Sequence, residues 1–179
     1  MRLATAMLTG ALLVGAAASA QDAKTGPYEP RFSALPDNPC ELLSVSQLAE
    51  VTGLPVLAAR QVPSIAKLVE AQRENRDPDP GTICSYETGT PVGAISIHVP
   101  KRQDRTTVQY WDDRAYYFET FPGSAEPLAG VGADAWISGG ASIHVLVSEN
   151  EHFTVSVQHY HPDNEELLIR AARRVLDRF

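Results

Sequence analysis

The five histidines are the residues of this chain best suited to chemistry, because a neutral imidazole can bind a metal ion or exchange a proton near neutral pH. All of them fall in or beside predicted strands: His98, His144, His152, His159 and His161. His159 and His161 form an H-x-H pair, and alternate residues of a strand point to the same side. Both rings would therefore face one way, a spacing that metal sites use.

A periplasmic zinc or copper site made by His159, His161 and His144 is accordingly one candidate. The opposite interpretation is equally simple, since half-exposed strand histidines are common without any ligand. Sulfur ligands from cysteine and methionine favour copper, and the sequence has only two of each residue. The metal site therefore stays an alternative, and no other cofactor is predicted.

No catalytic motif accompanies these histidines, and no catalytic residue is predicted. The chain contains no nucleophile elbow, H-E-x-x-H pair, P-loop or EF-hand loop. Gly130-x-Gly132-x-x-Ala135 matches the glycine pattern of a dinucleotide-binding site. Such a site needs a strand before the glycines and a helix after them, whose N-terminus binds the phosphate. Here a loop precedes the glycines and a strand follows, so the match is rejected. Asp112 and Asp113 would diverge by about 100° on a helix and form no acid–base pair. An unrecognised hydrolase remains a second alternative, and a protein that is not an enzyme is favoured.

Small polar residues on the predicted strands favour binding instead. Hydroxyl and imidazole side chains alternate there with apolar ones, so they share the face opposite to the core. The members of this face are Ser96, His98, Ser142, His144, Thr154, Ser156 and Gln158. The surface could take a partner protein or a small ligand, or be an ordinary water-facing sheet. The aromatic residues Tyr110, Tyr116, Tyr117 and Phe121 exceed what one helix face buries, so a groove beside that helix is a further expectation.

The strands that carry these residues follow from alternating hydrophobicity and from turn signals. They are predicted at residues 55–60, 82–88, 93–99, 133–138, 141–148 and 152–160. Gly139-Gly140 predicts a two-residue hairpin turn, and residues 149–151 a three-residue turn. This pairing sets Trp136 opposite Ile143 on the core side. It also gathers odd positions on one buried face, namely Ile143, Val145, Val147, Phe153, Val155 and Val157.

Four helices are predicted, at residues 44–52, 64–75, 104–119 and 163–179. Ser44 and Gln47 form a capping box and Gly53 ends the first helix, while Asp163 and Glu166 resemble a carboxylate capping box. Apolar stripes are expected to face the core in the second and third helices, at Ile65, Leu68, Val69, Val108, Trp111, Ala115 and Phe118. The terminal helix carries a wide apolar stripe and a solvated basic face, made by Arg170, Arg173, Arg174 and Arg178.

Blocks of strands and helices with antiparallel meanders predict an α+β fold. We expect a curved antiparallel sheet of about five to six strands with helices packed mainly on one face. The 179 residues are 44% hydrophobic, which supports one core and excludes a chain that is disordered throughout. The formal net charge of -7 leaves no electrostatic attraction for nucleic acid, which is excluded as a partner.

Residues 1–20 match a secretory signal peptide, since a positive start and an uncharged apolar stretch end at Ala18-Ser19-Ala20 before polar residues. Residues 21–38 contain three prolines and are expected to form a flexible segment. Residues 39–179 are expected to form the single α+β domain. The signal peptide predicts a periplasmic or secreted protein with no stable membrane insertion after the signal is cleaved.

Cys40 and Cys84 are the two cysteines of the chain. An exported chain with two cysteines most simply forms one disulfide, which would join the start of the first helix to a strand. A thiol metal site would need more ligands, and a redox site would usually show C-x-x-C. We therefore predict a structural disulfide.

The spacing of several short motifs resembles a known group of domains. The motifs are Pro39-Cys40-Glu41-Leu42-Leu43-Ser44, a helix that ends at Gly53, Cys84-Ser85-Tyr86, residues 130–136, and an Ala/Arg-rich terminal helix. Together they resemble the bacterial envelope domains of unknown function, common as actinobacterial lipoproteins, that begin P-C-x-L-L-[ST]. The resemblance implies an α+β sheet domain, a Cys–Cys staple and export, and it implies no chemistry.

The chain departs from that group in two ways. It lacks the lipid-acceptor cysteine, and it carries an additional helix at residues 64–75. The first departure predicts a soluble periplasmic protein. The expected function is therefore a non-enzymatic binding module for an envelope protein or a small ligand.

Overall fold

The computed structural model describes residues 35–78, 81–100, 107–148, 151–159 and 163–179. Within them lies one seven-stranded antiparallel sheet with the strand order β1-β2-β3-β7-β6-β5-β4. Its strands are β1 Val56–Val62, β2 Ile83–Thr88, β3 Ala94–His98, β4 Ala125–Pro127, β5 Asp134–Ser138, β6 Ser142–Ser148 and β7 Glu151–Val157. The helices are η1 Pro39–Glu41, α1 Val45–Thr52, α2 Ile65–Glu74, α3 Thr107–Thr120 and α4 Asn164–Leu176.

The α+β class with a curved antiparallel sheet is confirmed. The sheet exceeds the expected five to six strands because β4 forms within residues 122–132, where no strand was predicted. Its middle residue, Glu126, pairs with Ile137 of β5. A three-residue strand that contains proline gives too little alternation to be recognised from sequence.

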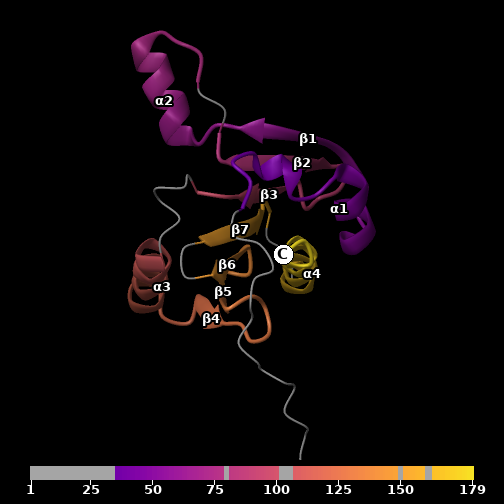
Figure 1. The fold of residues 1–179 in the computed structure, drawn as a ribbon, viewed down its shortest axis with the longest axis vertical. Helices are drawn as coiled ribbons and strands as arrows, with labels where there is room; N and C mark the ends of the chain where they lie inside the picture. Colours follow the sequence, from indigo (N-terminus) through magenta and orange to yellow (C-terminus); the bar gives the residue numbers. More distant parts are fainter. Residues whose placement is uncertain (1–34, 79–80, 101–106, 149–150, 160–162) are drawn as a thin grey trace, which may run out of the picture.

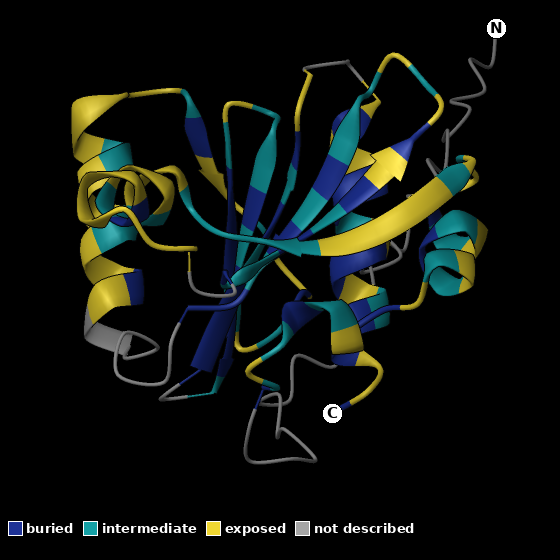
Figure 2. Ribbon diagram, turned by 90° about the horizontal axis from the view of Figure 1, so that it is seen from above, coloured by how far each residue is buried: buried dark blue, intermediate teal, exposed yellow. Residues whose placement is uncertain are grey.

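The two faces of the sheet differ in what covers them (Figures 1 and 2). The core face carries α1 and α4, and the side chains buried there include Ile95, Ile97, Ile143, Val145 and Val155, each 0% exposed. The opposite face, called the second face below, carries α3. Figure 1 shows α3 and α4 on opposite sides of the sheet. Helices therefore cover the core face as expected, and one helix also covers part of the second face.

The N-terminal part of the domain is held by local caps and by one long-range hydrogen bond. The capping box of Ser44 and Gln47 is present, and Gly53 ends α1 in the left-handed region at φ 70°. Tyr86 of β2 donates its hydroxyl proton to the Leu43 carbonyl at 2.7 Å. Burial raises the pKa of Tyr86 to about 12, so this hydroxyl stays a donor at any physiological pH.

Packing starts earlier in the chain than expected, at Leu35 rather than at Pro39. Leu35 is 0% exposed within the main core, and its backbone N–H donates to Glu151 Oε1 at 2.9 Å. The cap of α4 also differs, since the Asp163 side chain makes no capping hydrogen bond. Asn164 instead donates through Nδ2 to the His159 carbonyl at 2.9 Å.

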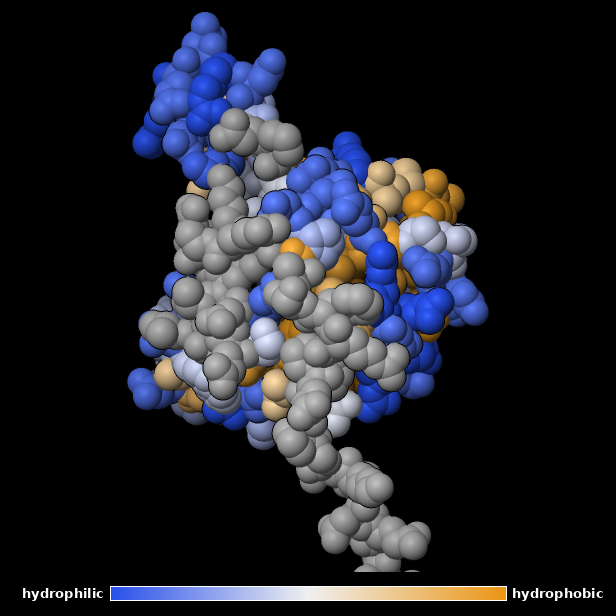
Figure 3. Space-filling model, in the orientation of Figure 1, coloured by the Kyte–Doolittle hydropathy of each residue, from blue (hydrophilic) through white to orange (hydrophobic). Residues whose placement is uncertain are grey.

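Helix α2 forms where the sequence predicted it, between the N-cap Ser64 and the left-handed C-cap Asn75. Its apolar stripe, however, does not face a core, because Ile65, Leu68 and Val69 are 80%, 46% and 41% exposed. The helix projects beyond β1 and β2, with mostly hydrophilic side chains on the side seen in Figure 3. An amphipathic stripe predicts which face of a helix is buried if another element packs on it. Among the described residues, no element lies over the apolar stripe of α2.

The prediction for Trp136 was wrong, and the β5–β6 hairpin explains why. Ser138 pairs with Ser142, so three residues make the loop, with Gly139 and Gly140 at φ 54° and 61°. The register therefore shifts by one residue from a two-residue turn, and a one-residue shift moves a side chain to the other face. Trp136 pairs with His144 and lies on the second face.

The apolar face of α3 was also predicted at a wrong rotation. Trp111 is 43% exposed, whereas Tyr110 is 1% exposed and packs with Trp136, Leu146 and Ala125 in a second small core. Tyr110 donates its hydroxyl proton to Asp134 Oδ2 at 2.9 Å. A phenol can be buried when its hydroxyl finds a partner, and the sequence alone did not show this partner.

The predicted disulfide is present, with Cys40 Sγ and Cys84 Sγ 2.02 Å apart. It joins η1 to β2 across a sequence separation of 44 residues. Closing a loop of that length restricts the unfolded chain, which stabilises the fold by about 4 kcal/mol in the chain-entropy description.

Reduction is therefore expected to lower the free energy of unfolding by about 4 kcal/mol. Urea unfolding of oxidised and fully reduced protein measures the difference. Since the chain has no other cysteine, reduction alters this bond alone. A decrease below about 1 kcal/mol would show that the loop is already restricted without the bond.

Candidate functional site

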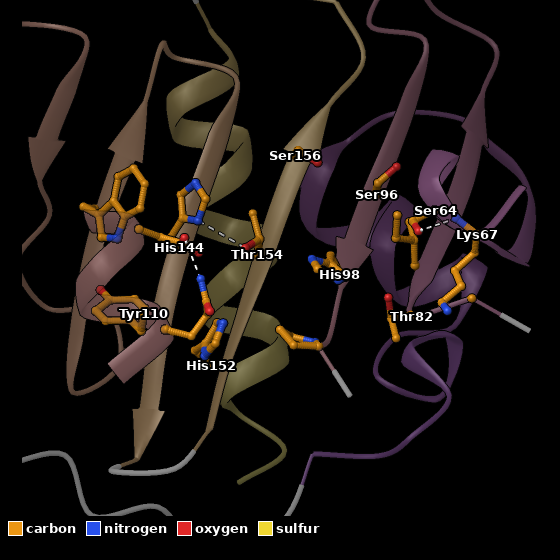
Figure 4. Close-up of a pocket in the computed structure, with 16 residues that line it drawn as sticks. Ser64, Lys67, Thr82, Ser96, His98, Tyr110, His144, His152, Thr154 and Ser156 are labelled. Atoms are coloured by element: carbon orange, nitrogen blue, oxygen red, sulfur yellow. Dashed lines mark hydrogen bonds between the residues drawn. The ribbon is translucent and has the colours of Figure 1, made fainter. Parts of the chain in front are cut away.

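A cavity of about 630 Å³ lies on the second face. Its floor comes from β2, β3, β7 and β6, and its sides come from the start of α2 and from α3 (Figure 4). Most of its exposed lining surface is apolar, although most of the lining residues carry a polar group; they are Ser64, Lys67, Gly81, Thr82, Ile83, Ser96, His98, Pro100, Gln109, Tyr110, Asp113, Trp136, His144, His152, Thr154 and Ser156. The volume is in the range of small-molecule binding sites.

The floor is ordered in rows because the strands are in register. Ser96 of β3 pairs with Ser156 of β7, and one pleat along the strands His98 pairs with Thr154. Thr154 in turn pairs with His144 of β6. Neighbouring strands are about 4.8 Å apart, and side chains on one face recur about 6.6 Å along a strand. The floor is therefore a small grid of hydroxyls and imidazoles.

His144 is the most constrained group of this grid. Its ring stacks on Trp136 with the centroids 3.7 Å apart and the planes 2° apart. Its two nitrogens lie within hydrogen-bond distance of hydroxyls, with Nδ1 3.2 Å from Thr154 Oγ1 and Nε2 3.3 Å from Ser138 Oγ. Burial, with a smaller contribution from His152 and His98, lowers the pKa of His144 to about 3. The ring is therefore neutral at physiological pH.

The other two floor histidines lie close enough to affect one another. Burial lowers the pKa of His98, and His152 adds to this decrease, while the Asp113 carboxylate opposes it. His152 is 5% exposed, and its ring centroid is 5.8 Å from that of Tyr110. Figure 4 shows His98, His144 and His152 around the same cavity.

The two charged side chains of the lining differ in their partners, since the lysine lies beside a carboxylate and the aspartate accepts a hydrogen bond from a neutral amide. Lys67 Nζ lies 2.6 Å from Glu70 Oε2 at the rim, and Asp113 Oδ1 accepts a hydrogen bond from Gln109 Nε2 at 2.9 Å. Since the lysine pairs with a carboxylate and the floor imidazoles His98 and His144 have lowered pKa values, the lining offers little uncompensated positive charge to a ligand.

Several polar groups of the floor, by contrast, are available. Among the described residues, the side chains of Thr82, Ser96, His98 and Ser156 make no hydrogen bond. In the same part of the chain, Nε1 of Trp136 is buried in the lining without an acceptor. Buried or half-buried polar groups usually have partners, so these atoms mark where a ligand or ordered water would bind.

The start of α2 reaches the cavity through a close approach of two backbones. A Cβ on Gly81 would overlap the Val62 carbonyl, so only glycine fits where β1 ends beside the start of β2. Gln61 Nε2 donates to the Gly81 carbonyl at 2.5 Å and fixes this crossing. Ser64 and Lys67 follow directly, which places them on the cavity wall (Figure 4).

Most of the polar face predicted from sequence lies in this site. Ser96, His98, His144, Thr154 and Ser156 line the cavity, whereas Ser142 and Gln158 are on the same face outside the lining. Sequence reasoning missed other lining residues, including Ser64, Lys67, Thr82, Gln109, Asp113 and Trp136, whereas Tyr110 belongs to the aromatic group that predicted a groove beside its helix. The alternation along the strands predicted the floor residues. No local sequence pattern indicates which helix lies over a sheet.

Of the three proposed metal ligands, the structure describes His144 and His159, and these two lie apart. His161 lies outside the described residues, and His159 is exposed beyond the end of β7. His144 pairs with Thr154, five residues before His159, which corresponds to about 16 Å along an extended strand. In the described part of the chain, no group of three or more His, Cys, Asp or Glu side chains could hold a metal ion.

The cavity contains serines, histidines and an aspartate, so the hydrolase alternative can be tested against its geometry. A catalytic triad needs a histidine between a hydroxyl and a carboxylate. His144 lies between two hydroxyls instead, and its pKa of about 3 makes it a weak base. Among the described residues, no hydrogen-bonded Ser–His–Asp chain is present, so the hydrolase alternative receives no support from the site.

Comparison with known proteins adds no assignment to this geometry. No protein-family model matches the chain, and neither does any curated protein or solved structure at a significant level. In the described residues, no helix is both long enough and apolar enough to cross a membrane.

The neutral state of His144 predicts how stability depends on pH. The unfolded chain binds a proton at this ring below pH about 6.5, whereas the folded protein does so only near pH 3, so acid favours unfolding. From pH about 6.5 to about 4.5 the wild type should lose about 2 kcal/mol more unfolding free energy than His144→Gln. Urea unfolding at both pH values measures this.

Glutamine is the matched replacement because it retains hydrogen-bonding groups without titrating in this range. His98 changes stability in the same direction in both proteins and cancels in the difference. Equal losses in wild type and His144→Gln would contradict the neutral, stacked imidazole.

Proposed function

We propose that this protein is an exported binding module that takes a small ligand into the cavity of the second face. The observation that carries the proposal is a group of floor side chains, Ser96, His98 and Ser156, whose hydrogen-bonding groups converge on one space and have no partner among the described residues. Pockets with a few convergent polar groups are the usual form of small-ligand sites.

The cavity is also placed on a rigid support. Its floor consists of four neighbouring strands whose other face is packed against α4 and α1, with Ile97 and Val155 fully buried beneath His98 and Thr154. Side chains on such strands lose little freedom on binding, so most of the interaction energy is retained. A preformed site of this kind suits binding without a large conformational change.

Export is the second half of the proposal. The signal-peptide pattern of residues 1–20 supports it, and the disulfide is the kind that persists in an oxidising compartment. The absence of a membrane-spanning helix in the described residues is consistent with a protein released after cleavage. The resemblance to P-C-x-L-L-[ST] envelope domains points the same way.

Filling the cavity tests the binding function. Ser156→Trp places an indole at the centre of the floor, and Ser46→Trp places the same group on the exposed surface of α1. Saturation-transfer NMR with a panel of uncharged sugars, amino acids, carboxylates, polyamines and a capped tripeptide should show at least one class that binds wild type and Ser46→Trp but not Ser156→Trp.

Circular dichroism and thermal unfolding establish whether Ser156→Trp keeps the fold. If it does not, Thr154→Phe, which fills the same floor one pleat away, replaces it in the comparison. A panel in which no class distinguishes the filled protein from wild type would overturn the binding function.

Export is tested separately from binding. The full chain expressed in a bacterium should be recovered from the periplasm or medium with Gln21 as its first residue, as read by mass spectrometry of the intact protein. A change of Ala18 and Ala20 to Leu should block cleavage while leaving the folded domain unchanged. A mature protein that retains Met1 in the cytoplasm would contradict the signal peptide.

A further inference from the structure

The chemistry of the unpaired groups narrows the class of ligand. This inference rests on the proposed function and concerns the same cavity. The available side chains Ser96, Ser156, Thr82 and His98 share one property, which is that each can donate and accept a hydrogen bond. A hydroxyl rotates to suit its partner, and a neutral imidazole donates at one nitrogen and accepts at the other.

Groups that both donate and accept are best matched by groups of the same kind. A carboxylate or phosphate only accepts, and an ammonium group only donates, so either would leave half of the hydrogen-bonding capacity of the floor unused. A ligand with several neighbouring hydroxyls would use both directions at each contact. Such a ligand also tolerates small errors in spacing, because its own hydroxyls rotate.

The charge of the lining disfavours an anionic ligand. Lys67 is already paired with Glu70, and Asp113 accepts from Gln109. An anionic ligand would lose water without gaining an unpaired counter-ion, and burying an uncompensated charge is costly, while a cationic ligand would find the Asp113 carboxylate but would use only the acceptors of the floor. A neutral polar ligand avoids this cost.

The arrangement of the floor fits a ring with hydroxyls around its edge. Ser96 and Ser156 lie side by side on neighbouring strands, and His98 and Thr154 form the next row. The two rows thus present polar atoms about 4.8 Å apart in one direction and about 6.6 Å apart in the other. Ile83 and Pro100 add apolar contacts at the side, which suit the C–H face of a sugar ring.

We propose that the cavity binds an uncharged polyhydroxyl ligand, a saccharide, through the hydroxyls of Ser96 and Ser156 and the ring of His98. A volume of about 630 Å³ accommodates a short saccharide rather than a single small metabolite. Trp136 Nε1 is a further donor in the lining that a ligand hydroxyl or an intervening water would satisfy.

The test compares neutral sugars with charged sugars and with a peptide. Glucose, N-acetylglucosamine, maltose and cellobiose are titrated against the protein by saturation-transfer NMR, beside glucuronate, glucosamine and the capped tripeptide. At least one neutral sugar should bind, and the acidic and amino analogues should bind at least about tenfold more weakly. Ser96→Ala with Ser156→Ala removes two hydrogen bonds and should weaken that sugar about tenfold to thirtyfold.

Ser142→Ala is the matched control. Ser142 is on the same face and pairs with Ser156 across β6 and β7, but it does not line the cavity, so its loss should leave sugar affinity unchanged. An equal loss in Ser142→Ala and in the double variant would place the sugar outside the cavity and overturn the proposal.

The two proposals fail in different ways. If only a charged compound or the tripeptide binds, and Ser156→Trp abolishes that binding, the saccharide is wrong while the small-ligand function holds. If no compound binds wild type better than Ser156→Trp, both are wrong.

Discussion

Burial of one face of the antiparallel sheet is the constraint on which the rest of the structure depends. Ile95, Ile97, Ile143, Val145 and Val155 are fully buried against α1, α4 and their neighbours. Each such side chain contributes about 1.5–3 kcal/mol, so a one-residue slip of any central strand would cost an amount comparable to the whole net stability of a domain. The register of the central strands is therefore strongly determined, and with it the position of every residue on the second face.

That register turns small polar residues into a site. Because the core face holds the strands in place, Ser96, Ser156, His98, Thr154 and His144 are aligned on the second face without having to stabilise the sheet themselves. They are free to be polar and half-exposed, which is the usual condition of an antiparallel sheet that faces water on one side. Here α3 and the start of α2 rise on either side of them, so a water-facing surface becomes a cavity (Figure 4).

The stacked pair of Trp136 and His144 links the cavity to the helix above it. Tyr117 of α3 packs against both rings, with its centroid 5.1 Å from that of Trp136 and 6.0 Å from that of His144. Covering His144 in this way removes it from water and favours its neutral form. The same packing that attaches α3 to the sheet thus gives the floor an imidazole that can both donate and accept.

The alternation along the strands, the capping box of Ser44, the stop at Gly53 and the pairing of Cys40 with Cys84 could all be deduced from the chain alone, because each depends on residues near in sequence or on a count of two. The alternation also separated the apolar core face from the polar residues of the future floor. These features depend on residues close in the sequence, so the sequence is sufficient to predict them. What only the tertiary structure decided was the length of the Gly139-Gly140 loop, the rotation of α3 and the projection of α2, since each depends on what lies across the sheet. A polar strand face looks the same in sequence whether it is open to water or enclosed between two helices, so the cavity itself could be recognised only in three dimensions.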